Sequence, residues 1–293
     1  MDSDAFQGLS DHEVFVRSGF KDLWLEFSPF GNIPPARTKV DATAVGFYAL
    51  SNNRVFVLGE DRNLWLEFGP FRSVPPSRQQ VDAKVQRFQP LSASEVLVLG
   101  FNDVLWLEYG PFGNVPPRRA AVDMNVRTFQ AVSDTEIFVL DNDRSLWLEF
   151  APFGSIPSRR TQIDTGVEAF QAIADTQVFV VRRDRYLLLE SGPFGQGLPP
   201  RTQVDADVLL FKALSNKQVL VLGMDRKLWL EFAPFGRIPP SRKQIDANVL
   251  KFQPLSESQV LVLGTDRKLW LESGAFGNAP PPRKQVDENV GPY

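Results

Sequence analysis

Charged and aromatic residues recur at intervals of 41 residues along this 293-residue chain, and their types suit two kinds of chemistry. An indole ring can stack on a sugar, while arginine and carboxylate groups can hydrogen-bond to its hydroxyls. The same arginine fork can instead bind a carboxylate through two hydrogen bonds and hold two parts of a fold together. A repeated ligand site and a repeated structural ion pair are therefore both compatible with the pattern.

Three charged positions are identical in all seven copies of the 41-residue block. They are Glu26, Glu67, Glu108, Glu149, Glu190, Glu231 and Glu272; Arg37, Arg78, Arg119, Arg160, Arg201, Arg242 and Arg283; and Asp41, Asp82, Asp123, Asp164, Asp205, Asp246 and Asp287. We favour a structural role for these charges because they persist in the fifth copy, where Leu188 replaces the tryptophan of the other copies. We also expect the tryptophans to pack between neighbouring repeats, because they lie mid-strand between aliphatic residues.

The residues predicted to contact a ligand combine arginines and tryptophans with small polar residues of proline-rich loops. They are Asn32, Arg37, Ser73, Arg78, Asn114, Arg119, Ser155, Arg160, Arg201, Arg242, Asn278, Arg283, Trp65, Trp106, Trp147, Trp229 and Trp270. The small polar residues vary between copies. Such variation would tune the specificity of a ligand site, and it is equally expected of an unconstrained surface.

The elements that position these residues follow from the copy that begins at Val81. Strands are predicted at residues 85–91, 95–99, 105–109 and 119–123, where β-branched, aliphatic and aromatic residues concentrate. A Gly/Asp turn at residues 100–103 predicts a hairpin, and the prolines of residues 110–117 exclude a central strand. A phenylalanine recurs in all seven proline-rich loops, where it suits an apolar plug.

Seven such blocks without an insertion predict an all-β, seven-bladed β-propeller with four antiparallel strands per 41-residue blade. A single domain is expected over residues 1–293, because no linker or change of composition interrupts the repeat. The block is marked by Leu23, Leu64, Leu105, Leu146, Leu187, Leu228 and Leu269. A β-solenoid is the main structural alternative. The last strand either completes the seventh blade or pairs with the first.

The Asp-Arg hairpin turn that leads into Leu-Trp-Leu-Glu resembles the tectonin-like and other lectin-type β-propellers. The resemblance spans the whole chain at the level of blade architecture. It implies sugar pockets between adjacent blades, up to seven of them, and a role in host defence or in recognition of foreign surfaces.

Composition excludes several classes of chemistry. The chain has no cysteine and only one histidine, His12, which argues against thiolate, zinc and Ser-His-Asp sites, and no cofactor or metal is expected. A net charge of −3 and scattered basic residues argue against nucleic acid. Because neither a signal peptide nor an apolar run of ~18 residues is seen, we expect a soluble cytosolic protein without membrane insertion, with non-classical release left open.

No phosphate loop or nucleophile elbow occurs, so we expect no enzymatic activity, although a carboxylate-pair glycosidase stays formally possible. Regular repetition suits multivalent binding. The sequence therefore predicts a non-enzymatic lectin with repeated shallow glycan sites at blade interfaces and on the proline-loop rim. The alternative is a protein-interaction propeller that binds a peptide or partner domain through one asymmetric patch. The sequence leaves the oligomeric state open.

Overall fold

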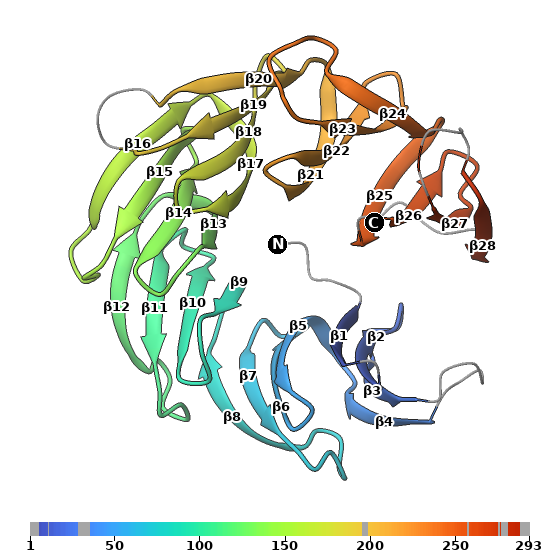
Figure 1. The fold of residues 1–293 in the computed structure, drawn as a ribbon. Coiled ribbons are helices and arrows are strands. Elements are labelled where there is room, and N and C mark those ends of the chain that lie inside the picture. The colour runs from blue at the N-terminus through green and yellow to red at the C-terminus, as the bar shows by residue number, and fades with distance from the viewer. Residues whose placement is uncertain are drawn as a thin grey trace. The chain divides into compact units, whose positions relative to one another are not determined.

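The computed structural model describes residues 6–10, 12–28, 36–194, 199–256, 258–274, 276 and 281–287. The chain divides into two compact units. One comprises Met1–Asn142 and Glu149–Arg160, and the other comprises Asp143–Leu148 and Thr161–Tyr293. The described residues form seven four-stranded sheets, called blades one to seven in chain order (Figure 1). No helix capable of spanning a membrane occurs in this described part of the chain.

Each blade is built from four consecutive strands. Blades one to three contain β1 (Phe6–Ser10), β2 (Glu13–Arg17), β3 (Leu23–Phe27) and β4 (Ala36–Asp41); β5 (Ala44–Ser51), β6 (Arg54–Gly59), β7 (Leu64–Phe68) and β8 (Ser77–Asp82); β9 (Val85–Pro90), β10 (Glu95–Gly100), β11 (Leu105–Tyr109) and β12 (Arg118–Asp123). Blade four contains β13 (Val126–Ala131), β14 (Glu136–Asp141), β15 (Ser145–Phe150) and β16 (Arg159–Thr165). Blades five to seven contain β17 (Val167–Ala174), β18 (Gln177–Arg182), β19 (Leu187–Ser191) and β20 (Arg201–Asp205); β21 (Val208–Ser215), β22 (Gln218–Gly223), β23 (Leu228–Phe232) and β24 (Ser241–Asp246); β25 (Val249–Ser256), β26 (Gln259–Gly264), β27 (Leu269–Ser273) and β28 (Arg283–Asp287).

This architecture confirms the predicted seven-bladed β-propeller with four antiparallel strands per blade. In blade three the strands differ from the predicted boundaries by no more than one residue at either end. The last strand, β28, pairs with β27 and so completes the seventh blade. A single domain over residues 1–293 stays a prediction.

Within each unit, both faces of a blade are buried against neighbouring blades. On β6, Val55 and Val57 pack in a cluster with Phe15 of blade one. Phe56 and Leu58, which point the opposite way, pack in a cluster that includes residues of blade three. The strand therefore lacks alternation between buried and exposed positions, as its continuous run of Val, Phe and Leu predicts.

The phenylalanines of the proline-rich loops act as plugs between successive blades. Phe112 of blade three is 7% exposed, and its ring meets Phe56 of blade two edge-on at a centroid distance of 6.1 Å. Phe235 contacts Phe179 in the same way in the second unit. The plug predicted from the sequence thus belongs to the preceding blade's interface, where an edge-to-face ring pair adds to the burial of apolar area.

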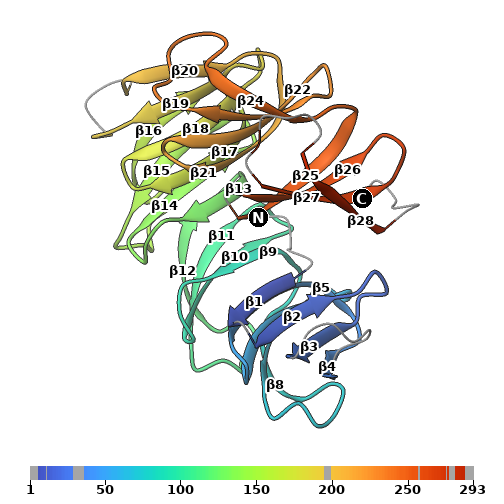
Figure 2. The ribbon, with the colours of Figure 1, turned by 45° about the vertical axis from the view of Figure 1, so that its right-hand side comes forward.

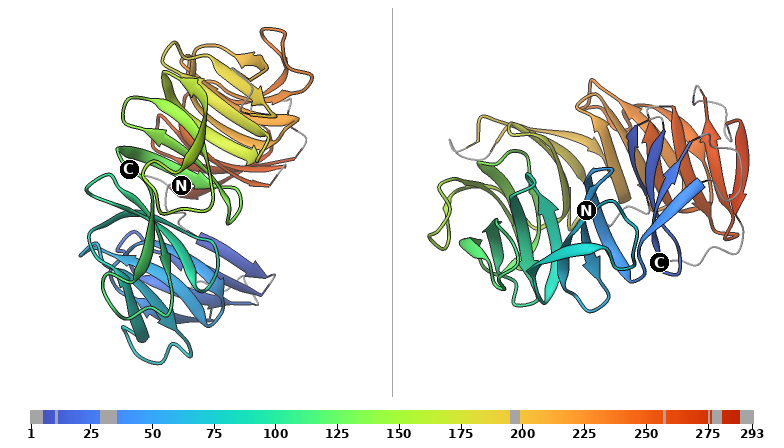
Figure 3. Two further views of the ribbon diagram at one scale, coloured as in Figure 1. Left: turned by 90° about the vertical axis from the view of Figure 1, so that its left-hand side faces the viewer. Right: turned by 90° about the horizontal axis from the view of Figure 1, so that it is seen from below.

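Backbone hydrogen bonds also join successive blades. The N–H of Val85, at the start of blade three, donates to the carbonyl of Arg62 in the β6–β7 turn at 2.9 Å. Arg62 has a φ of 63°, which directs its carbonyl out of its own hairpin. The first strands of successive blades also contact each other, as β1 and β5 do in the first unit (Figures 2 and 3). The Asp-Arg turns therefore have a structural task.

Candidate functional site

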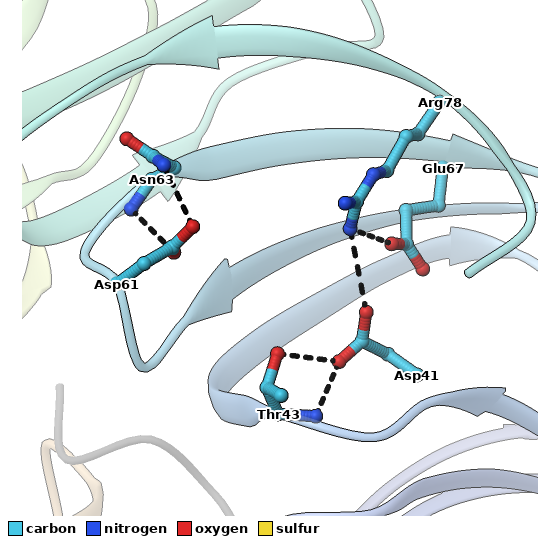
Figure 4. Close-up of polar contacts among 6 residues, drawn as sticks. All are labelled: Asp41, Thr43, Asp61, Asn63, Glu67 and Arg78. Atoms are coloured by element: carbon cyan, nitrogen blue, oxygen red, sulfur yellow. Dashed lines mark hydrogen bonds and ion pairs between the residues drawn. The ribbon is translucent and has the colours of Figure 1, made fainter. Parts of the chain in front are cut away.

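The invariant arginines lie between successive blades. Arg78 of β8 reaches Glu67 of its own blade, with Nη1 3.6 Å from Oε1, and Asp41 of the preceding blade, with Nη1 3.7 Å from Oδ2 (Figure 4). Asp41 also accepts a hydrogen bond of 2.6 Å from the Thr43 backbone N–H at the start of blade two. One arginine thus contacts the carboxyl groups of two blades.

The same trio recurs at six junctions between blades. The arginine-to-aspartate pairs are Arg78–Asp41, Arg119–Asp82, Arg160–Asp123, Arg201–Asp164, Arg242–Asp205 and Arg283–Asp246. Each of these arginines also lies 3.5 to 3.9 Å from the glutamate of its own blade. Arg37 contacts Glu26 at 3.8 Å. These contacts give the invariant charges the structural task favoured from the sequence, and a ligand-binding role for the arginines stays a prediction.

The oxygens of the buried glutamates accept no hydrogen bond. Glu108 has no exposed area, and neither of its carboxylate oxygens accepts a hydrogen bond; the same holds for Glu67, Glu149, Glu190, Glu231 and Glu272. The arginine at 3.8 Å from Glu108 is too distant for a hydrogen bond. Burial, and next the nearby Asp82 carboxylate, raise the pKa of Glu108 to about 9. The structure therefore favours a neutral glutamic acid at these junctions at neutral pH.

The tryptophans are partly exposed, and each indole described by a ring contact is covered by an arginine. The guanidinium carbon lies 4.0 to 4.1 Å from the ring centroid in the pairs Arg78–Trp65, Arg119–Trp106 and Arg242–Trp229, and 4.4 Å in Arg283–Trp270. Trp147 is partly exposed as well. These arginine contacts are cation–π stacking within one blade, and packing of the indoles between neighbouring blades stays a prediction. Their sugar-stacking role stays a prediction.

The small polar residues of the predicted ligand set lie on the proline-rich loops. Ser73, Asn114 and Ser155 are exposed there. Asn32 and Asn278 lie outside the described residues. The structure brings the invariant arginines together with tryptophans and carboxylates, and it leaves these loop residues apart from those trios.

The proline-rich loop of blade two departs from the repeat at one residue. Arg72 stands where the other copies have Gly31, Gly113, Gly154, Gly195, Gly236 and Gly277. In blade three the N–H of Gly113 donates to the carbonyl of Gln80 in the preceding blade at 3.0 Å, with a φ of +120°. In blade two the N–H of Arg72 instead donates to Pro70 within its own loop at 2.8 Å.

The physical reason is the backbone conformation that docking requires. A φ near +120° is open to glycine and unfavourable for a residue with a Cβ. Gly154 and Gly236 also adopt positive φ, at +134° and +108°, and also donate to the preceding blade. Arg72 adopts no positive φ, so its loop forms a different turn and forgoes this bond with blade one.

A pocket of about 560 Å³ lies between this loop and blade one. Its apolar lining comes from Leu25, Phe27, Pro70 and Phe71. Its polar lining comes from Glu13, Thr38, Asn52, Asn53 and Arg72. The volume falls within the range of small-ligand and side-chain pockets, and both walls belong to the first unit.

The sequence analysis missed Arg72. The available signal was a lost glycine in an otherwise constant loop position, which marks a changed backbone conformation. We consider this pocket the candidate functional site, because it combines apolar walls with a polar lining that includes Arg72, which stands where the other six copies have glycine.

Replacing Arg72 by glycine is expected to close the pocket. The new glycine can adopt a positive φ and donate its N–H to the carbonyl of Lys39, the position that corresponds to Gln80. A crystal structure of Arg72→Gly should show this hydrogen bond at about 3 Å. The reciprocal change, Gly113→Arg, should open a matching pocket between blades two and three. A loop that keeps its Arg72-type turn in the Arg72→Gly protein would contradict this account.

Comparison with known proteins supports the fold and provides no sequence relative. No protein-family model matches the chain, and no curated protein matches it. The structure resembles the C-terminal WD40 domain of Sif2, with a TM-score of 0.55 and 11% identity over 90% of this chain and 79% of that one. It resembles the WD40 β-propeller domain of Doa1, with a TM-score of 0.54 and 13% identity over 92% of each chain. It also resembles a chain from the structure of Kap60 bound to yeast RCC1 (Prp20), with a TM-score of 0.50 and 10% identity over 88% of this chain and 76% of that one.

The fold therefore places the protein in the structural class of seven-bladed β-propellers. Identities of 10 to 13% carry the likeness no further than the fold.

Proposed function

We propose that this chain is a non-enzymatic interaction module that binds a protein partner, and that the partner's anchoring segment enters the pocket between blades one and two. The observation that carries the proposal is the break in the repeat at Arg72, which lines a pocket formed by residues of blades one and two. A single asymmetric patch is the feature expected of a protein-interaction propeller. Multivalent glycan recognition calls instead for the same pocket in several blades.

The contacts that the repeated arginines already make also favour a protein-interaction module over a lectin. The arginines predicted to read sugar hydroxyls contact carboxylates of two blades and stack on the indoles. A sugar at these positions would have to displace contacts that join the blades. Among the similar structures, one holds RCC1 (Prp20) bound to Kap60, so a propeller chain of this general architecture serves in a protein complex.

A displayed-peptide selection against the purified full chain tests the proposal. We expect a family of related peptides to be enriched, and we expect Arg72→Gly to reduce their binding about tenfold or more by closing the pocket. The matched control is Arg237→Ser, which removes one exposed cation from the proline-rich loop of blade six, where the glycine is intact. That variant should bind like the unmodified chain.

A glycan array on the same preparations provides the opposing arm. Saturable glycan binding at several sites per chain, lost when Arg119 is replaced and unchanged in Arg72→Gly, would overturn the proposal in favour of a lectin. Absence of any enriched peptide from a folded preparation would also overturn it.

A further inference from the structure

We infer that the pocket between blades one and two binds a carboxylate of a peptide segment, with an apolar residue of the same segment against its aromatic wall. The inference rests on the proposed function and specifies the chemistry of the anchor. Four features of the pocket lead to it: an unengaged cation, a second donor, the charge balance and the apolar wall.

Arg72 is the cation. Its side chain makes no hydrogen bond or ion pair with any described residue, whereas the guanidinium of Arg78 contacts two carboxylates and an indole. Its planar guanidinium group can donate two parallel hydrogen bonds to one carboxylate. An arginine at the edge of a pocket with all its donors unused within the described structure suits an anionic ligand.

Asn53 provides the second donor. Its side-chain oxygen accepts a hydrogen bond of 2.8 Å from the Ser51 hydroxyl, and its amide N–H groups have no partner among the described residues. The backbone holds this residue beside the loop, because the Gly69 N–H donates to the Asn53 carbonyl at 2.8 Å. The same backbone hydrogen bond recurs in other blades, where Ala151 donates to Thr135 and Ala233 donates to Lys217, each at 2.9 Å.

Glu13 sets the charge balance. Its carboxylate accepts a hydrogen bond of 3.1 Å from the Asn52 side chain. Glu13 and Arg72 form no ion pair with each other, although both line the pocket. With one cation and one anion, the pocket lining is neutral. A monoanionic carboxylate can pair with Arg72 in that setting, whereas a phosphate of charge near −2 would be repelled more strongly by Glu13.

The wall formed by Leu25, Phe27, Pro70 and Phe71 accounts for the apolar neighbour. Phe71 is 7% exposed and stays packed edge-on against Phe15 at 6.2 Å, so it is a fixed part of the floor. Phe27 is only partly buried. A volume of about 560 Å³ has room for a short stretch of peptide.

The test uses synthetic octapeptides derived from the displayed-peptide selection, with both ends blocked and a fluorescent label. Each Asp or Glu is replaced in turn by Asn or Gln, and one set regains a free C-terminal carboxylate. Binding to the full chain is measured by fluorescence polarisation for the unmodified protein, Arg72→Lys, Arg72→Gly and the control Arg237→Ser. Melting temperatures identify any variant that fails to fold.

We expect one acid-to-amide replacement to weaken binding about tenfold or more, and Arg72→Lys to weaken it less than Arg72→Gly does. If only the free C-terminus restores binding, the anchoring carboxylate is the chain end, which still upholds the inference. If all amide analogues bind like the parents while Arg72→Gly abolishes binding, the inference is wrong and the proposed function stands. If Arg72→Gly leaves peptide binding unchanged, both the inference and the proposed function are wrong.

Discussion

Raising the pH from 6 to 9 is expected to destabilise this protein, lowering its melting temperature by roughly 10 °C or more. Burial first, and then a nearby aspartate, raise the pKa of Glu108, Glu149 and Glu231 to about 9 in the folded chain. Burial likewise raises the pKa of Glu67, Glu190 and Glu272 to about 8. In the unfolded chain these groups return to their ordinary value near 4.5.

The direction follows from proton binding. Between about pH 4.5 and 8 the folded chain holds protons on glutamates that the unfolded chain has released. The stability that these protons contribute is complete below the unfolded pKa and is lost as the pH rises through the folded pKa. One such group changes the free energy of unfolding by up to about 1.4 kcal/mol per pH unit. Over three units that alone corresponds to a shift in melting temperature of roughly 8–16 °C, at the sensitivity typical of domains of about 150–250 residues.

Thermal unfolding followed by circular dichroism at pH 6 to 9 measures this dependence. A triple variant, Glu67→Gln, Glu108→Gln and Glu149→Gln, should reduce the pH dependence by roughly half. Glutamine is neutral at every pH and has nearly the same shape, and Glu190, Glu231 and Glu272 still titrate. The control is Asp175→Asn, which changes an exposed acid in the turn before β18. A melting temperature that is level or rises towards pH 9 in the unmodified chain would contradict the burial of neutral glutamic acids.

Removing the arginine from one junction between blades is expected to cost about 3–5 kcal/mol. Arg160 is the best position, because its Nη1 donates a 2.7 Å hydrogen bond to Asp123 and lies 3.7 Å from Glu149. Asp123 is 2% exposed and Glu149 is fully buried, so Arg160→Ala leaves carboxyl groups in the interface without their cation. Denaturant unfolding of Arg160→Ala at neutral pH measures the loss.

The adjacent residue provides a matched control. The Arg159 guanidinium lies 5.8 Å from the Phe150 ring centroid at an exposed position, so Arg159→Ala should cost less than about 1 kcal/mol. Adding Asp123→Asn and Glu149→Gln to Arg160→Ala should recover part of the stability, because the remaining side chains are then neutral. Equal losses for the two arginines would show that the junction depends on apolar packing alone.

Much of the fold could be predicted from the sequence because strand formation and turns are local properties. The run of β-branched and aliphatic residues in β10 and the Gly/Asp turn after it lie within a few residues of each other. An exact 41-residue repeat then multiplies one correct blade into seven. The constant phenylalanine of each proline-rich loop likewise predicted a plug.

The candidate site was harder to predict from the sequence than the fold. The sequence shows that Arg72 replaces a constant glycine. It does not show that in blades three, four and six this glycine adopts a positive φ and donates a hydrogen bond to the preceding blade. Such a φ is a property of the folded loop. The residue types of blade two alone do not predict which hydrogen bond a glycine at position 72 would make.

The sequence by itself determined the number of blades, the position of their strands and the identity of the recurring charges. Only the tertiary structure decided which charges meet. Arg78 is paired with Glu67 of its own sheet and with Asp41, 37 residues earlier, because the strand that carries it lies against the end of the preceding blade. Tertiary packing also buries Glu67 without a hydrogen bond to either carboxyl oxygen, and this burial is the main reason that its pKa is raised to about 8.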